Sequence, residues 1–317
     1  MTEICLEEIE GNERDQIETE IKDALRIFFK NRENPVEKIV VAEDFNETVR
    51  KFLHKSSWEK RDYNQLHEYG VALAKTIPEF ENREISFNLI LDRRLFQRLD
   101  FVGRFDRLGL FIHEFTHMVD DKLRFDSVGQ KEFRAVPKSK KETLFKVGWI
   151  IWQEYHAERI VLEIYEAIRN EKITFEYKPK LGNFETLKEN LSSLPKFLRG
   201  NISKFRNWQL TPEEIHRLIM SRVNSILILY AYVFALSDAV AKLKDRVVDL
   251  RHLDGFRFLS EDLLHIHVIL LELHKRKKEY NSELIHRIGS LIDSILMKCG
   301  LEIRDAPEGY YIEVHDG

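Results

Sequence analysis

The chain has only two cysteines, and they indicate no cysteine-based site. Cys5 and Cys299 lie near opposite ends and show no C-x-x-C spacing, so neither a disulfide framework nor a thiolate zinc site is predicted. We expect free thiols in a reducing compartment. The first residues, MTEICLEEIEGNERDQIE, lack the basic and apolar regions of a secretory signal peptide. The sequence therefore predicts a cytoplasmic protein.

Charge and hydropathy give no support to a nucleic-acid or membrane partner. The 50 Lys and Arg residues nearly balance the 54 Asp and Glu residues, which leaves a formal net charge of −4. Short basic clusters at 242–246 and 274–278 have acidic residues around them and are expected to form solvated helix faces. The most apolar run, at 226–236, is well short of the roughly 18 residues that span a bilayer. The oligomeric state is left open.

The length and pattern predict an α+β, mostly helical protein with two parts. A chain of 317 residues is long enough for one large domain or two. Helical spacing over 13–31 precedes a β-branched segment at 37–43, and helical spacing resumes after Asp44, a predicted N-cap. After about residue 180 the pattern becomes almost entirely helical. We therefore place the boundary between a domain at 1–180 and a helical domain of unknown role at 181–317.

Two further strands are expected before the central motif, at 70–77 and 84–92. Pro and Asn in the intervening PEFENR favour a loop at 78–83. An edge strand of such a pair could bind an extended peptide backbone by strand addition. The alternative, that these strands only close the core, is equally open.

The C-terminal half predicts several long helices. One or two helices are expected over 183–205, with a break near Pro195 and Gly200. Thr211-Pro212-Glu213-Glu214 predicts a capping box that opens a helix to about 245. The remaining expectations are a short strand at 173–177, helices at 259–278 and 282–299, and a terminal hairpin from 301 onward.

The motif that carries chemistry is His113-Glu114-Phe115-Thr116-His117. On a helix, two histidines four residues apart share a face and can bind one Zn²⁺, and the Glu between them can act as general base on the metal-bound water. At 100° per residue the apolar stripe lies opposite; it consists of Leu108, Ile112, Phe115, Val119 and Leu123. The sequence therefore predicts a metal helix over 105–124 with one face in a cleft, followed by a loop at 126–141.

The third zinc ligand is expected on the next helix, predicted at 142–170. Its middle is apolar nearly all round, yet it carries Glu154 and Glu158 at that depth. A buried carboxylate needs an ion pair, hydrogen bonds or a metal. The two are four residues apart, so one could ligate while the other orients a ligand histidine. Tyr155 and His156 are candidate transition-state stabilisers, although such residues more often serve in packing.

These residues resemble the gluzincin metallopeptidases, and among them the compact zinc peptidases of the ImmA/IrrE type. The resemblance covers about residues 100–165 and rests on HEFTH followed by the Glu-x-x-Ala segment at 154–157. It implies a zincin-like core, with His113, His117 and Glu154 as ligands of one Zn²⁺ and Glu114 as the base. Glu158 falls where thermolysin-like enzymes keep an acid that orients a ligand. After Ala157 the chain departs from the ImmA/IrrE pattern.

The predicted function is a zinc-dependent metallopeptidase that acts on a peptide or protein substrate. The alternative is a catalytically quiet protein on a zincin scaffold that recognises a partner through its helical C-terminal part. Both readings require zinc, and hydrolysis separates them.

Overall fold

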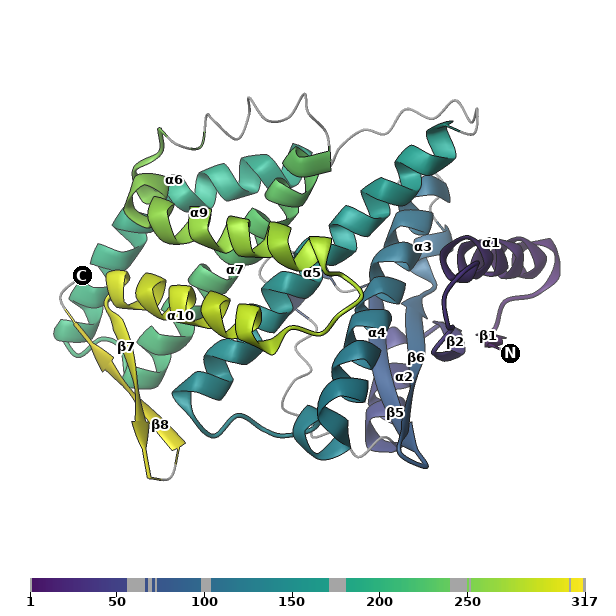
Figure 1. Ribbon diagram of the computed structural model, residues 1–317, viewed down its shortest axis with the longest axis horizontal. Helices are drawn as coiled ribbons and strands as arrows, with labels where there is room; N and C mark the ends of the chain where they lie inside the picture. The colour runs from purple at the N-terminus through teal and green to yellow at the C-terminus, as the bar shows by residue number, and fades with distance from the viewer. Residues whose placement is uncertain are drawn as a thin grey trace. The chain divides into compact units, whose positions relative to one another are not determined.

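Two units, each with its own core, make up the chain in the computed structural model (Figure 1), which describes residues 2–55, 66–67, 70–71, 73–97, 104–170, 181–239, 250, 252–307 and 309–315. The fold is α+β and mostly helical, as predicted. The N-terminal unit is Met1–Arg134 and the helical unit is Ala135–Gly317. The predicted boundary at 180–181 falls inside the helical unit, because α5 (Lys140–Asn170) packs against later helices.

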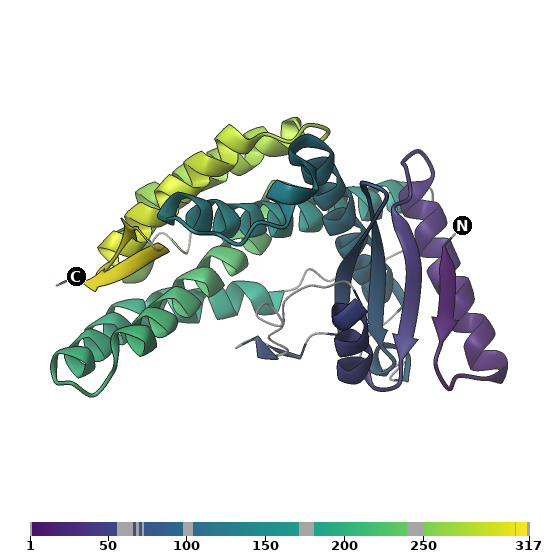
Figure 2. The ribbon, with the colours of Figure 1, turned by 90° about the horizontal axis from the view of Figure 1, so that it is seen from below.

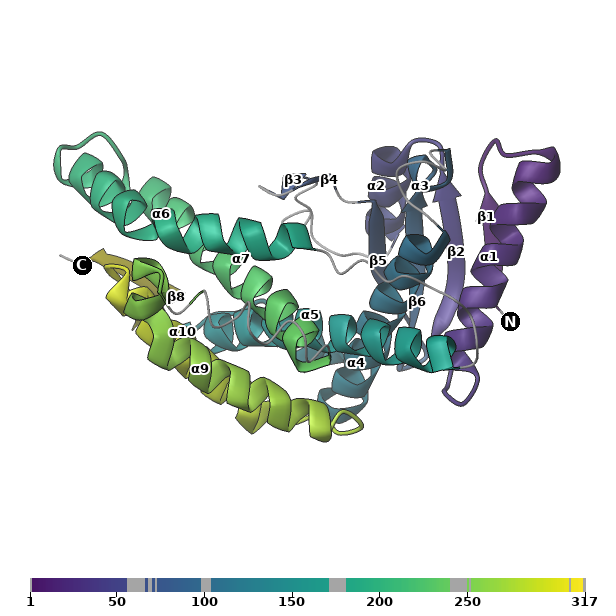
Figure 3. The same ribbon diagram turned by 90° about the horizontal axis from the view of Figure 1, so that it is seen from above.

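A four-stranded sheet forms the centre of the N-terminal unit. Its order is β1 (Glu3–Leu6), β2 (Val36–Ala42), β6 (Glu84–Asp92) and β5 (Ala74–Glu81), seen side by side in Figure 3. The first three strands are parallel and β5 is antiparallel to β6. The central strands are apolar without alternation because both faces of the sheet are covered. The predicted strands at 37–43 and 84–92 are confirmed.

Helices cover both faces of this sheet. On one face, α2 (Phe45–Lys55) packs on a cluster that includes Val40 and Ile90. Alternate strand residues point to the opposite face, where α1 (Gly11–Phe29) and α4 (Arg104–Phe133) contact each other and α4 contacts β5 and β6. Asp44 caps α2 as predicted, since its Oδ1 accepts a 3.0 Å hydrogen bond from the Glu47 amide. A short helix, α3 (Arg94–Gln97), and a small hairpin of β3 (Leu66–His67) and β4 (Gly70–Val71) complete the described elements.

Two predictions in this unit need correction. The expected loop at 78–83 is mostly strand, because β5 continues to Glu81 and only Asn82 and Arg83, with φ of 49° and 69°, form the turn. Pro78 is tolerated since its missing amide falls on the outer side of an edge strand. The expected loop at 126–141 is helical to Phe133, with a break in α4 at Gly129, where φ is 77°.

Within the described residues, the helical unit consists of α5 and four further helices. Tight contacts hold them together; a Cβ at Gly255, for example, would lie 1.9 Å from the Leu191 carbonyl oxygen. Its last two helices lie side by side and lead into the C-terminal hairpin, drawn in yellow (Figure 2). The elements after α5 are α6 (Leu181–Arg206), α7 (Pro212–Ala239), α9 (Asp254–Lys275), α10 (Ser282–Lys298), β7 (Leu301–Ala306) and β8 (Gly309–Val314).

Most predictions for this half are confirmed. The capping box at the start of α7 is present: Thr211 Oγ1 accepts from the Glu214 amide at 3.2 Å, and Glu214 Oε2 accepts from the Thr211 amide at 2.8 Å. The expected break near Pro195 is wrong, because α6 runs through it as one helix. The strand expected at 173–177 lies outside the described residues.

The helix α7 is long and apolar enough, by length and composition, to cross a membrane. More than half of its most apolar window is buried inside the helical unit. Ile219, Val223 and Ile226 are among its residues in that core. This burial is the pattern of a core helix in a soluble protein.

A buried ion pair joins α4 to α1. The Arg107 guanidinium donates from Nε and Nη2 to the two carboxylate oxygens of Glu20, both at 2.8 Å. Both side chains are buried, and Arg107 also lies over the Phe96 ring, 5.7 Å from its centroid. The two-pronged geometry fixes the position of α4 along α1.

We expect Arg107→Leu to lower the free energy of unfolding of the N-terminal unit by about 3–5 kcal/mol, because it leaves the Glu20 carboxylate buried without its partner. Urea denaturation measures this. The double variant Glu20→Leu/Arg107→Leu should be clearly more stable than Arg107→Leu alone. Lys51→Leu, which removes an exposed pair with Glu47, is the control and should change stability by less than about 1 kcal/mol. Equal effects of Arg107→Leu and Lys51→Leu would contradict the interpretation.

Candidate metal centre

The helix α4 presents the H-E-x-x-H residues on the side away from its buried face. Ile112 and Phe115 are fully buried as predicted, whereas His113, Glu114 and His117 are only partly buried. The buried face is rotated from the predicted stripe. Leu108, Val119 and Leu123 are partly exposed, and Phe111 and Met118 are buried in their place.

Aromatic contacts at Phe115 set the rotation of α4. Its ring lies 5.7 Å from Phe28 and 5.2 Å from Phe29 of α1, and 6.4 Å from Phe111 one turn earlier. Such ring pairs favour particular orientations and contribute about 0.5–1.5 kcal/mol each beyond burial. His113 and His117 are two residues before and after Phe115, which places them on nearly the opposite side of the helix. The packing of Phe115 therefore directs both histidines away from the buried face.

The two histidines converge on one point. Their Nε2 atoms are 2.9 Å apart, and their rings are nearly perpendicular, at 89°. Two nitrogens bound to one tetrahedral Zn²⁺ at about 2.05 Å would be about 3.3 Å apart, so a small opening of the pair fits the ion. The same separation suits an N–H···N hydrogen bond between neutral rings. The donor set therefore fits zinc and is compatible with a metal-free pair.

Glu114 contacts the edge strand of the sheet. Its Oε2 accepts a 2.9 Å hydrogen bond from the Thr76 hydroxyl of β5. Thr76 faces α4 because its neighbour Ile77 points to the α2 side of the sheet. This bond holds the carboxylate beside β5, on the same side of α4 as the histidines.

The comparisons give no relative. No protein family model, no curated protein and no solved structure matches this chain.

Glu154 and Glu158 lie on α5 in the helical unit. Glu154 is partly buried, and its Oε2 accepts a 2.5 Å hydrogen bond from the Tyr232 hydroxyl of α7. Glu158, one turn later, is buried at 2% exposure. Within this unit Glu154 is thus the more accessible of the two carboxylates and is held in place by Tyr232. That it completes the zinc site stays a prediction.

Tyr155 and His156 are engaged inside the helical unit. The Tyr155 hydroxyl donates to Asp238 at 2.6 Å, and burial raises the pKa of that hydroxyl far above its ordinary value. The His156 ring stacks on Trp152 with centroids 4.6 Å apart. These contacts favour a packing role for both residues over the predicted role in transition-state stabilisation.

The network around Asp238 ties three helices together. Besides Tyr155 of α5, His267 of α9 places its Nε2 2.8 Å from Asp238 Oδ2. Burial alone would raise the pKa of Asp238, but the hydrogen bonds from His267 and Tyr155 outweigh it and hold the pKa below its ordinary value. Asp238 therefore stays ionised and fixes α5 against α7 and α9.

Sequence reasoning missed Thr76 and Tyr232, the two partners of the acidic candidates. A threonine in a strand carries no signal of its own, because β-branched residues are common there. Tyr232 lies in the apolar run at 226–236, where a hydroxyl needs a partner. That requirement is a usable signal, but it does not say which partner.

A second His and acid group lies on the C-terminal hairpin. Glu302, Glu313 and His315 bring potential ligand atoms within 4.8 Å of one another. Arg304 makes ion pairs with both glutamates, at 2.9 Å each. This cation occupies both carboxylates and offsets one of their two negative charges, so we expect the group to bind zinc poorly.

We predict that the purified chain binds about one Zn²⁺, measured by elemental analysis and by titration calorimetry. His113→Ala and His117→Ala should each weaken binding at least 100-fold, since each removes a direct ligand. His315→Ala is the matched control and should keep full affinity. Loss of zinc in His315→Ala, with retention in His113→Ala, would move the metal site to the hairpin.

Proposed function

We propose that this chain is a zinc-dependent metallopeptidase of the gluzincin type, working in the cytoplasm. The observation that carries the proposal is the arrangement on α4 of two converging histidine Nε2 atoms and of a Glu114 carboxylate held beside an edge strand by Thr76. A general base between two zinc ligands and next to a strand edge suits hydrolysis of an extended peptide.

The N-terminal unit supports the finer proposal of a zincin-like core. It has a small mixed sheet, an antiparallel edge strand and an H-E-x-x-H helix packed on one face. These are the sheet and the active-site helix that the resemblance implies, whereas the predicted Glu-bearing helix, α5, belongs to the helical unit. With no similar solved structure, the proposal depends on this arrangement and on the motif.

The third ligand in the proposal is Glu154. The support is the Glu-x-x-Ala segment on the helix after the motif, together with the Tyr232 hydroxyl that orients one carboxylate oxygen. A hydrogen bond from a neighbouring hydroxyl to one oxygen is a common way to orient a ligand carboxylate. Glu158 is buried and would act through its neighbours.

The proposed reaction divides roles between the ion and the protein. Zn²⁺, when bound, supplies Lewis acidity that makes a water more acidic and polarises the scissile carbonyl. Glu114 accepts a proton from the attacking water as the new C–O bond forms. It then returns the proton to the amine nitrogen as the C–N bond breaks. Thr76 positions the Glu114 carboxylate for both transfers.

The edge of β5 is a suitable place for the substrate backbone. Within the described residues β5 pairs only with β6. The Asp92 amide donates to the Leu73 carbonyl, so in this register Ala74 and Thr76 direct both backbone groups to the outer side, and Pro78 directs its carbonyl alone. An extended peptide could therefore add a strand next to Glu114.

We expect Glu114→Gln to keep zinc and lose peptide hydrolysis by at least 1,000-fold in kcat, because the amide cannot accept the proton. Cleavage of a peptide library, read by mass spectrometry, measures activity, and elemental analysis measures zinc. Glu132→Gln, which alters an exposed residue of the same helix, is the control. Full activity in Glu114→Gln would remove the mechanism. Zinc with no turnover in the wild type would favour the catalytically quiet alternative.

The choice between the two acidic residues of α5 has its own test. Glu154→Gln should weaken zinc binding about 100-fold or more, whereas Glu158→Gln should change it by less than about tenfold. Calorimetric titration with Zn²⁺ compares the two variants, and circular dichroism checks their folding. The reverse order would make Glu158 the ligand. Tyr232→Phe should retain zinc with an intermediate loss of affinity.

A further inference from the structure

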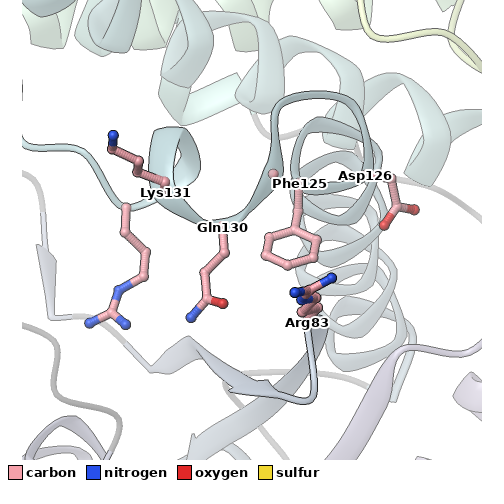
Figure 4. Close-up of a pocket in the computed structure, with 7 residues that line it drawn as sticks. Arg83, Phe125, Asp126, Gln130 and Lys131 are labelled. Atoms are coloured by element: carbon pink, nitrogen blue, oxygen red, sulfur yellow. The ribbon is translucent and has the colours of Figure 1, made fainter.

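A basic pocket lies at the hairpin end of β5, within the N-terminal unit. It is a surface cavity of about 670 Å³ between the end of α4 and the β5–β6 turn, lined in part by Arg83, Phe125, Asp126, Gln130, Lys131 and Arg134. In Figure 4, Phe125 and Gln130 point from α4 toward the hairpin that carries Arg83. The proposed peptidase site does not use these residues.

Backbone geometry creates the pocket. The left-handed conformation of Gly129, with φ of 77°, breaks α4 and turns its last residues away from the helix axis. On the other side, the positive φ values of Asn82 and Arg83 make a two-residue hairpin turn that presents the exposed Arg83 side chain. The two features leave a space between helix and hairpin.

An aromatic cluster supports the side of the pocket that Phe125 lines. Phe80 of β5 lies 5.8 Å from Phe125 and 6.0 Å from Phe133, centroid to centroid. The Arg134 guanidinium lies over the Phe80 ring at 5.2 Å. The stacking holds the guanidinium in place, and its planar shape suits recognition of a carboxylate.

The charge of the pocket is positive. Arg83, Lys131 and Arg134 contribute three cations against one carboxylate, that of Asp126. The Lys122 ammonium lies 3.1 Å from Asp126 and offsets it. A cavity with this charge balance, an aromatic ring at Phe125 and an amide donor at Gln130 suits a carboxylate on a short stem.

We propose that this pocket binds an acidic side chain of the peptide substrate, about five residues to the N-terminal side of the scissile bond. The inference rests on the proposed function. The strand β5 leads from Thr76, beside Glu114, to Glu81, next to the turn that carries Arg83. Five residues of strand span about 17 Å.

The helix α4 spans a similar distance between the proposed base and the pocket. From Glu114 to Phe125 the helix rises about 16 Å, so base and pocket are separated by about the span of five extended substrate residues. Antiparallel pairing with β5, the more stable kind, runs the substrate toward its N-terminus as it approaches the pocket. This fixes the side of the scissile bond on which the acid lies.

A hydrolysis assay tests the proposed position of the acidic residue in the substrate. A library of peptides is digested with the full zinc-loaded chain, and the best-cleaved sequence is then made with Glu, Gln or Lys at the fifth position before the cut. We expect the Glu peptide to exceed the Gln peptide about five- to tenfold in kcat/KM. Arg83→Glu should remove this preference and favour the Lys peptide. Arg14→Glu, a charge reversal at an exposed residue of α1, should leave the preference unchanged.

Binding tests the pocket independently of catalysis. Fluorescence anisotropy compares labelled hexaglutamate and hexaglutamine peptides on the full-length Glu114→Gln variant, with and without Arg83→Glu. Tighter binding of hexaglutamate by at least fivefold, lost in Arg83→Glu, supports the pocket even if the wild type cleaves nothing, in which case only the proposed function fails. Cleavage without acidic preference overturns the inference and leaves the peptidase standing. Equal binding of both peptides also overturns it.

Discussion

The packing of α4 between α1 and the sheet is the interaction on which the candidate centre depends. Phe115 and Ile112 are fully buried, and helical geometry then directs His113 and His117 to the opposite side. This packing sets the rotation of α4 but would still allow the helix to shift along its axis. The buried Arg107–Glu20 pair removes that freedom, because any shift would break two charge-assisted hydrogen bonds in a dry environment.

The strand β5 connects the chemistry with substrate recognition. Its Thr76 hydroxyl holds the Glu114 carboxylate, and in this register its outer backbone groups face away from β6. The same strand continues through Pro78 to the turn beside the basic pocket. Pro78 is compatible with the sheet because its missing amide faces outward and breaks no bond to β6, and it offers a substrate only its carbonyl. The number of residues along β5 therefore sets the distance between the proposed base, Glu114, and the pocket proposed to select an acidic residue.

Polar residues in the helical unit have a structural reason to be buried. Asp238 accepts hydrogen bonds from Tyr155 and His267, which lie on two other helices. These hydrogen bonds offset the desolvation of the Asp238 carboxylate, and the network fixes the rotation of α5. Glu154, one residue before Tyr155, is held by Tyr232 in the same way. The rotation that buries Tyr155 therefore also determines where Glu154 points within this unit.

The sequence by itself determined the order and type of most elements, the capping box at Thr211 and the histidine pair, because each depends on residues a few positions apart. It misjudged Pro78, Pro195 and the length of α4, where tertiary contacts or edge position outweigh local preference. Only the tertiary structure decided that Thr76 meets Glu114, that Tyr232 meets Glu154 and that Arg83 faces the end of α4. Those contacts join residues distant in sequence, and no local spacing encodes them.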